Sequence, residues 1–267
     1  MLPLVLAIIA TVLYLAGALA IAQPLLNRPA LVSRSVGLAL AGGGVAAHAA
    51  AELLRHGGGI DLHFFTALSV VVLLVAALTL AVNIARPVAG LGVIVFPLAA
   101  SLVTLDILVQ PSSQPLSLGW QIQLHVAVAL LAYAVLSLAA VLAILLLGQE
   151  RALRNHRLSG GLVRVLPPLT LTEALMFRLV GAGFALLTLT LLSGVLFVEN
   201  LFAQHLVHKT VLSLVAWVVF GVLLFGRWRF GWRGRRAVRL VLTGMGVLLL
   251  GFFGSKFVLE LVLQRAN

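Results

Sequence analysis

The stretch "LHVAVALLAYAVLSLAAVLAILLL", from Leu124 to Leu147, contains no acidic or basic residue other than one histidine and decides the fold class of this chain. About 20 consecutive apolar residues in a helix are enough to cross the hydrocarbon core of a bilayer. The whole chain has 267 residues, of which 62% are hydrophobic and only 9% are charged. Soluble domains average about half apolar and roughly a quarter charged residues. The sequence therefore predicts an all-α, polytopic membrane protein.

Apolar runs of this length predict a bundle of about eight transmembrane helices. They cover residues 2–22, 33–54, 64–84, 88–108, 121–148, 174–198, 204–226 and 238–263. The stretch "TLTE", from Thr170 to Glu173, has the pattern of a capping box and is expected to start the sixth helix. No loop is large enough to fold by itself, so residues 1–267 are expected to form a single integral membrane domain.

The arginine and lysine residues predict the orientation of this bundle. All but four of the 18 lie on one side of the predicted membrane, and the exceptions are Arg55, Lys209, Lys256 and Arg265. Because cytoplasmic loops are enriched in these residues, both termini are expected to face the non-cytoplasmic side. The basic run "GRWRFGWRGRR" is then a cytoplasmic turn beside anionic lipid. The net charge of +11 thus gives the orientation and does not indicate nucleic-acid binding.

Four of the seven histidines lie within or at the start of predicted helices, namely His48, His125, His205 and His208. His48 precedes the outer end of its helix by six residues, which places it about 9 Å inside that end. His125 follows Trp120, at the outer start of the fifth helix, by five residues. His208 opens the seventh helix on the same side. Imidazoles from three helices are therefore expected in one layer of the outer leaflet.

Neutral imidazole is a common axial ligand of haem iron, and two facing histidines can hold a haem between them. The stretch "AGGGVAAHAAA", from Ala41 to Ala51, leaves one side of the helix around His48 bare, which would admit a flat macrocycle. Arg55 and Lys209 lie on the outer side, where they can pair with haem propionates. His48, His125 and His208 are therefore candidate metal ligands.

Each of these features also has a simpler explanation. His48 and His125 can each hydrogen-bond a neighbouring helix, and the small residues around His48 can serve close helix packing. His208 can be solvated at the interface, and Lys209 can extend to the lipid headgroups.

The other polar residues are less specific. Lys256 and Glu260 are spaced as an i,i+4 pair, and Asp106 lies near the outer end of the fourth helix. The simplest interpretation is that they form satisfied ion pairs within the membrane. Cysteine is absent, which excludes disulfides and thiolate metal sites, and no nucleophile–base–carboxylate arrangement or phosphate-binding loop is visible.

Three stretches resemble the cytochrome c assembly superfamily (CcsA/CcmC-like), whose members handle haem for the maturation of c-type cytochromes. They are Leu124–Leu147, "FRLVGAGFALLTLTLLSG" (Phe177 to Gly194), and "KTVLSLVAWVVFGVLLFGRWRFGWRGRRA" followed by "FFGSKFV". The likeness is strongest over 124–263. The short HemX-like or YpjD-like branch fits best, including a histidine in the second helix, and implies the bacterial inner membrane.

The chain departs from the family where haem-handling relatives have a tryptophan-rich outer segment. Lys209 matches the lysine that ends this segment, but "VLFVENLFAQHLVH" between Gly194 and Lys209 contains no tryptophan. His208 stands where the family has proline. The resemblance carries His125 over directly as a haem ligand and His48 through the shorter branch. The missing tryptophan motif argues against a complete haem–cytochrome ligation activity, so we do not expect an enzyme.

The leading hypothesis is a membrane protein for haem handling or cytochrome c assembly. It would bind haem b non-covalently through His125 and either His48 or His208, with Lys209 on a propionate. Its expected partners are membrane lipid and proteins of cytochrome maturation or haem biosynthesis. The alternative is a haem-free, HemX-like regulatory or scaffold protein that acts through the cytoplasmic loops at 149–173 and 227–237. A small transporter or proton-coupled channel is a third hypothesis, although the inverted repeat of many transporters is missing.

Overall fold

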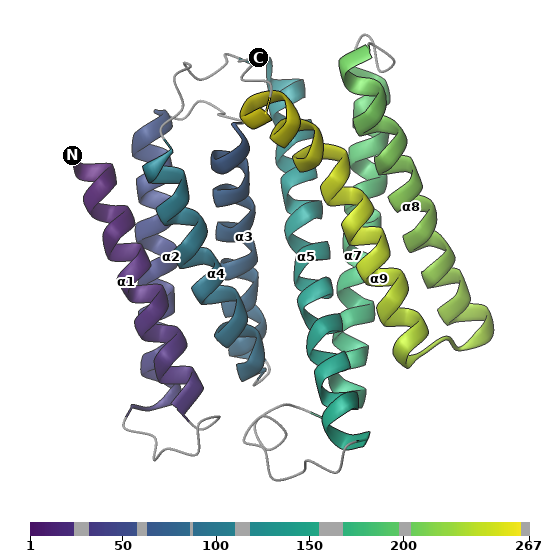
Figure 1. Cartoon of the computed structure of the whole chain (residues 1–267), viewed down its shortest axis with the longest axis horizontal. Helices are drawn as coiled ribbons and strands as arrows, with labels where there is room; N and C mark the ends of the chain where they lie inside the picture. Colours follow the sequence, from purple (N-terminus) through teal and green to yellow (C-terminus); the bar gives the residue numbers. More distant parts are fainter. Residues whose placement is uncertain are drawn as a thin grey trace. The chain divides into compact units, whose positions relative to one another are not determined.

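The computed structural model describes residues 1–23, 32–57, 63–85, 88–109, 118–154, 168–197 and 204–262. These residues form helices only (Figure 1). In chain order the α-helices are α1 (Leu2–Ala22), α2 (Arg34–His56), α3 (Phe64–Ala85), α4 (Ala89–Leu108), α5 (Trp120–Arg154), α7 (Leu169–Phe197), α8 (Gln204–Phe230) and α9 (Gly234–Leu249). Two π-helical segments, η2 (Leu250–Gly254) and η3 (Phe257–Val262), continue from α9.

Within the described ranges, 8 helices are long and apolar enough to cross a membrane, which confirms the predicted all-α membrane fold. Most bounds agree with the prediction within a few residues. The expected capping box at "TLTE" is wrong, because α7 already begins at Leu169 and Thr170 to Glu173 lie inside the helix. Proline is tolerated just before a helix, so Pro168 allows this earlier start, and the Leu171 N–H donates to the Pro168 carbonyl oxygen at 2.9 Å.

Contacts between helices divide the chain into two compact units. The first contains α1, α2, nearly all of α3, α4, the last turns of α5 and the first three residues of α7. The second contains most of α5 and the rest of α7 with α8, α9, η2 and η3, together with His63 and Phe64. Each unit is described by itself below.

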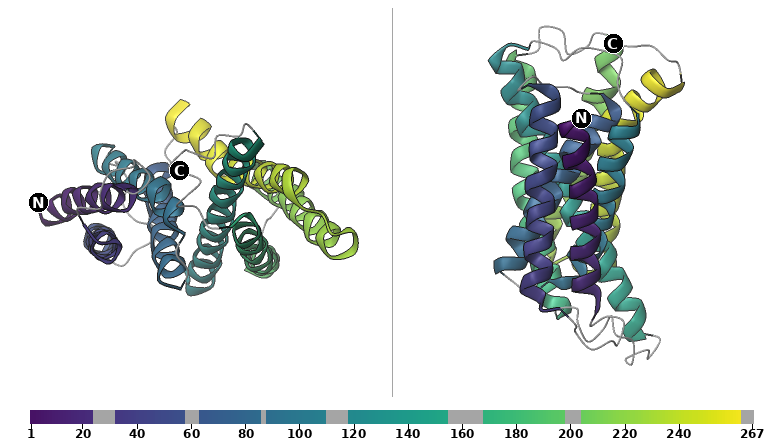
Figure 2. Two further views of the ribbon diagram at one scale, coloured as in Figure 1. Left: turned by 90° about the horizontal axis from the view of Figure 1, so that it is seen from below. Right: turned by 90° about the vertical axis from the view of Figure 1, so that its left-hand side faces the viewer.

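In the first unit, small residues allow α1 and α2 to pack closely side by side (Figure 1 and Figure 2). A methyl group at Gly17 of α1 would lie 2.9 Å from the backbone oxygen of Gly37 on α2. Gly44 lies against the buried ring of Tyr14, whose Cδ1 would be 3.0 Å from an added Cβ. Gly44 and, more loosely, Gly43 therefore serve helix packing, and the side of α2 at Gly44 is covered by Tyr14.

This packing predicts different outcomes for two glycine-to-alanine substitutions. Gly17→Ala forces a methyl group onto the backbone of α2, so it is expected to lower the free energy of unfolding by about 1–3 kcal/mol, as overpacking does. Gly42→Ala is the matched control, because nothing lies within 4 Å of its added Cβ. Unfolding of both variants in mixed micelles tests the prediction, and equal stability of the two would contradict it.

In the second unit, the central part of α5 is the most enclosed element. Its Tyr133 is buried, and the Tyr133 hydroxyl donates to the Leu248 carbonyl oxygen of α9 at 2.7 Å. The Tyr133 ring packs edge-on against Phe253 in η2, with the ring centroids 5.6 Å apart. These contacts attach the end of α9, where the helix widens into its π segments, to the middle of α5.

Candidate functional site

His48 of α2 lies at the centre of a hydrogen-bonded cluster in the first unit. The side chain is completely buried, and its Nδ1 lies 3.4 Å from the Tyr14 hydroxyl oxygen of α1. Its Nε2 lies 2.9 Å from Ser69 Oγ of α3 and 3.5 Å from a Glu52 carboxylate oxygen. Both ring nitrogens therefore have partners within the protein, as expected of a buried polar group.

The cluster extends from His48 towards the end of α2. Ser69 Oγ donates to Glu52 Oε1 at 2.7 Å, and the other Glu52 oxygen lies 3.3 Å from His56 Nε2. We refer to Tyr14, His48, Glu52, His56 and Ser69 as the His48 network. The network joins α1, α2 and α3 through side chains that would each be costly to bury alone.

A buried ion pair lies near the same end of the first unit. The Arg55 guanidinium of α2 pairs with the carboxylate of Asp106 of α4, and Thr66 Oγ1 donates to the other Asp106 oxygen at 3.0 Å. The Asp106 side chain is completely buried. This confirms the expectation that Asp106 is part of a satisfied ion pair within the membrane. Because Arg55 pairs with Asp106, the structure differs from the expectation that Arg55 pairs with a haem propionate.

His125 of α5 has a different environment in the second unit. It is half-buried, and its Nδ1 lies 2.8 Å from Ser193 Oγ of α7. Ser193 Oγ in turn donates to the Thr190 carbonyl oxygen at 3.0 Å. The imidazole is therefore oriented from one side by α7, through a hydroxyl whose own position is fixed by the helix backbone.

His208 and Lys209 lie near the start of α8, which begins at the same end of the second unit as α5 (Figure 1). His208 is exposed and Lys209 is half-buried. The Lys209 ammonium lies 5.7 Å from the centroid of the Phe252 ring, within range of a cation–π contact. Lys256 lies 5.8 Å from the same ring centroid. The side chain of His205 is outside the described part of the structure.

The predicted pair of Lys256 and Glu260 is confirmed, because Lys256 Nζ donates to a Glu260 oxygen at 2.7 Å. The last segment that is long and apolar enough to cross a membrane is Gly234–Gly254, so Glu260 follows this span instead of lying inside it as expected. Its other oxygen accepts a hydrogen bond from the Phe64 N–H at 2.8 Å. Burial acts to raise the pKa of the Glu260 carboxyl. This effect is outweighed by the hydrogen bonds from Lys256 and the Phe64 N–H and by the charges of Lys256 and His63, so the pKa is lowered. Glu260 is therefore ionised at neutral pH.

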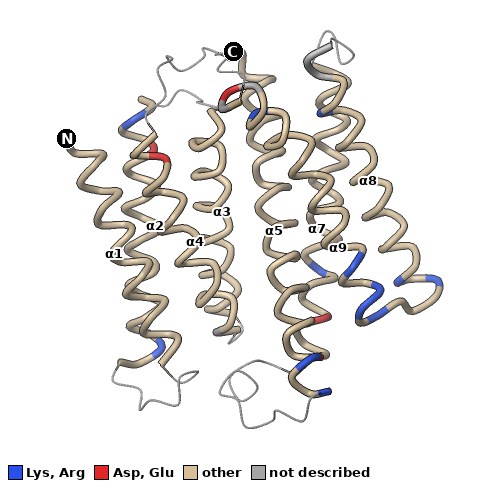
Figure 3. The backbone as a smooth tube through the Cα atoms, in the orientation of Figure 1, with Lys and Arg blue, Asp and Glu red and all other residues tan. Residues whose placement is uncertain are grey.

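In the second unit, the basic residues around the α8–α9 turn lie at the opposite end of α8 from its start (Figure 3), and Lys209 lies near that start. Within the described residues, no group of three or more His, Cys, Asp or Glu side chains is arranged so that it could hold a metal ion.

Residues 32–263 match the family described as Cytochrome C assembly protein. The chain belongs to this family. The matched region contains all four candidate residues, His48, His125, His208 and Lys209, but excludes α1 and its Tyr14. The Tyr14 end of the His48 network therefore lies outside the matched region.

Similar proteins agree with this membership in the cytochrome c assembly family. The inner membrane protein YpjD of Escherichia coli K12 is 41% identical over 138 residues, which is 52% of this chain and 52% of YpjD. An uncharacterized 28.8 kDa protein of Azospirillum brasilense is 42% identical over 147 residues, 54% of each chain. The cytochrome c biogenesis protein CcsA of Thermosynechococcus vestitus is 28% identical over 207 residues, 61% of this chain and 65% of CcsA.

These comparisons confirm the predicted superfamily and its YpjD-like branch. The chain spans about half the length of the YpjD and Azospirillum proteins that it matches. No solved structure matches it.

For this family member, sequence reasoning missed Tyr14, Glu52, Ser69 and Ser193. Glu52 had a usable signal, because it follows His48 by four residues and so lies on the same face of α2. Tyr14 and Ser193 had no comparable signal. Their contacts with His48 and His125 join residues that are 34 and 68 positions apart in the chain.

Proposed function

We propose that this chain is an inner-membrane protein of cytochrome c biogenesis that binds haem b non-covalently, with His125 as one axial ligand. Its family membership and its similarity to CcsA, a cytochrome c biogenesis protein, support the process. Its similarity to YpjD supports the inner-membrane location. The single observation that supports the ligand is the contact between His125 Nδ1 and Ser193 Oγ at 2.8 Å.

This contact fits the chemistry of a metal-binding histidine. Such histidines usually have one ring nitrogen hydrogen-bonded to a second residue, which fixes the tautomer and the orientation of the ring. With Nδ1 held by Ser193, Nε2 is the nitrogen that would bind iron. The haem would supply an iron centre whose electronic properties depend on its axial ligands. His125 would hold the iron, and Ser193 would hold His125.

For the second axial ligand the local environments favour His208 over His48. His48 is completely buried and both of its nitrogens are engaged in the His48 network. Binding iron through His48 would require this network to open and would leave buried polar groups without partners. His208 is exposed and belongs to the same unit as His125. Its neighbour Lys209 supplies an ammonium for a propionate, as the resemblance implied.

Ser193→Ala tests the role of Ser193 in orienting His125. Loss of a residue that orients a metal ligand typically lowers metal affinity about 10–100-fold, so haem affinity is expected to fall within this range. The measurement is a haem titration of the detergent-purified protein, followed by the Soret band. Ser213→Ala is a control, since it also removes a hydroxyl from a helix of the second unit but at a site away from His125's described contacts. Equal haem affinity of Ser193→Ala and the wild type would contradict the proposal.

A second candidate function is the haem-free scaffold, and one observation favours it. Helix α5 continues to Arg154, past the predicted end of its span, and exposes Arg151 and Arg154 in its last turn. Such a basic helix end can contact an acidic protein partner. Under this function, purified protein supplied with haem would show no Soret band, and exchanging both arginines for glutamine would weaken binding of the partner.

A further inference from the structure

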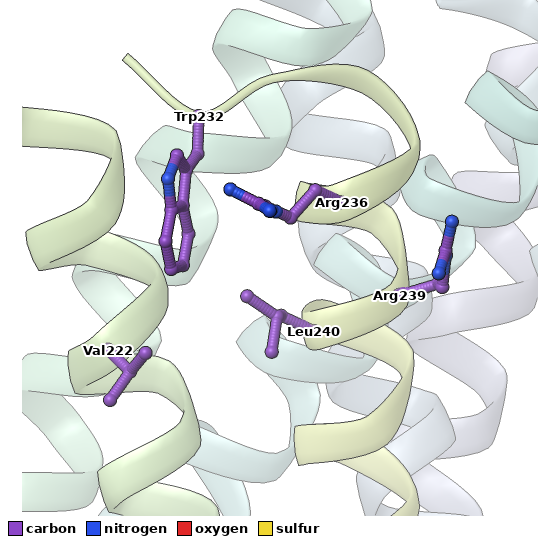
Figure 4. Close-up of a pocket in the computed structure, with 5 residues that line it drawn as sticks. All are labelled: Val222, Trp232, Arg236, Arg239 and Leu240. Carbon is purple, nitrogen blue, oxygen red and sulfur yellow. The ribbon is translucent and has the colours of Figure 1, made fainter. Parts of the chain in front are cut away.

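A pocket between α8 and α9 has no role in the proposed haem site. It lies where the two helices are joined in the second unit and has a volume of about 500 Å³. Five residues line it: Val222, Trp232, Arg236, Arg239 and Leu240 (Figure 4). Its lining therefore combines apolar side chains from both helices with an indole and two guanidinium groups.

The turn between the helices holds the indole of Trp232 in place. Gly231 and Gly234 have φ angles of 64° and 55°, which allow the chain to reverse on both sides of Trp232. The Trp232 ring packs directly on Gly226 of α8, where an added Cβ would lie only 2.2 Å from it. Arg227 Nη1 donates to the Trp232 carbonyl oxygen at 3.2 Å. One wall of the pocket is thus formed by the fold itself and requires no ligand.

The positive charge of this turn is only partly neutralised within the protein. The Glu173 carboxylate of α7 forms ion pairs with two of the arginines: Oε1 lies 3.6 Å from Arg227 Nη1, and Oε2 lies 3.3 Å from Arg233 Nε. Arg236 and Arg239 are exposed and form no ion pair with a carboxylate among the residues that the structure describes. The Arg236 guanidinium lies 4.8 Å from the centroid of the Trp232 ring. Figure 4 shows Arg236 pointing across the pocket towards Trp232, while Arg239 extends from another side of α9.

We propose that this pocket binds one anionic phospholipid of the cytoplasmic leaflet. The arginine distribution predicts that this end of the protein is cytoplasmic, where the membrane surface is negatively charged. Arg236 would bind the headgroup phosphate through its planar guanidinium, and Arg239 would add positive charge at the rim. Val222 and Leu240 would contact the upper part of an acyl chain. A soluble anion would leave these apolar side chains without a partner, which favours a lipid over free phosphate.

Quenching of tryptophan fluorescence by brominated lipid tests this site directly. The full-length protein is placed in phosphatidylcholine vesicles that contain either brominated phosphatidylglycerol or brominated phosphatidylcholine. The brominated anionic lipid is expected to quench more strongly, and Trp232→Phe should remove this excess while Trp120, Trp217 and Trp228 still report on the bilayer. Inorganic phosphate should not compete with the lipid.

Charge variants show whether the effect belongs to this pocket. One basic residue near an anionic membrane surface contributes about 1 kcal/mol, so Arg236→Gln should weaken the affinity for phosphatidylglycerol about fivefold. Arg236→Lys should be intermediate, because it keeps the charge but loses the planar guanidinium. Arg229→Gln is the matched control, since Arg229 is an exposed arginine of the same turn that does not line the pocket.

Three outcomes would overturn the proposal. Equal quenching by the two brominated lipids would show that the pocket does not select anionic lipid. An equal loss in Arg229→Gln and Arg236→Gln would show a general charge effect without a defined site. Competition by inorganic phosphate would assign the pocket to a soluble anion. None of these results depends on haem, so they leave the proposed function untouched.

Discussion

His125→Ala is expected to abolish high-affinity haem binding. The substitution removes the iron ligand itself, so the loss of affinity should exceed the 10–100-fold typical for a residue that only orients a ligand. The measurement is an optical spectrum of the purified protein, oxidised and then reduced with dithionite. The wild type should show a Soret band with sharp reduced α and β bands, and the variant should lack them while remaining assembled in the detergent micelle.

Three further variants make this result specific. Gln123→Ala changes an exposed residue near the start of α5, close in sequence to His125, and should leave the spectrum unchanged. His208→Ala should retain haem with weaker binding and shifted bands, because one axial ligand would be exchanged. If His48→Ala shifted the bands and His208→Ala did not, the second ligand would be His48. An unchanged spectrum in His125→Ala would refute His125 as a ligand.

Asp106→Ala is expected to cause the largest loss of stability in the first unit. It removes the carboxylate that pairs with Arg55 and accepts a hydrogen bond from Thr66. Removing one partner of a buried ion pair leaves an uncompensated charge and typically costs about 3–5 kcal/mol. We therefore expect the free energy of unfolding in mixed micelles to fall by this amount, and the bilayer should increase the cost.

A double variant distinguishes the cost of losing the ion pair from the cost of leaving Arg55 buried without a partner. Replacing both residues, as Arg55→Met with Asp106→Leu, removes the charges together and should recover most of the stability, because buried pairs exchanged for apolar residues are often nearly neutral. Ser101→Ala, at an exposed position of the same helix α4, is a control with little expected effect. A loss under 1 kcal/mol in Asp106→Ala would mean that water or another group reaches Arg55.

The histidine layer illustrates the limit of reasoning from helix position. Counting residues from the helix ends placed His48 and His125 at a similar depth, so helix position made both of them candidate ligands for iron. The structure separates them by their contacts: His48 is enclosed by Tyr14, Ser69 and Glu52, whereas His125 is half-buried and held from one side by Ser193. The partners of each imidazole come from other helices, and no spacing within α2 or α5 specifies them.

The sequence by itself determined the membrane fold, the number of spans and the family. The hydrocarbon core sets the length of each span and excludes charge from most of it. The fold class and the number of spans can therefore be predicted from the local composition of the chain. The pair of Lys256 and Glu260 was also predictable, because its members lie four residues apart on one helical segment. Only the tertiary structure decided that Arg55 belongs to Asp106, that Tyr14 covers Gly44 and that Ser193 orients His125. These contacts depend on which helices become neighbours and how they are rotated, and that is fixed by packing between segments far apart in the chain.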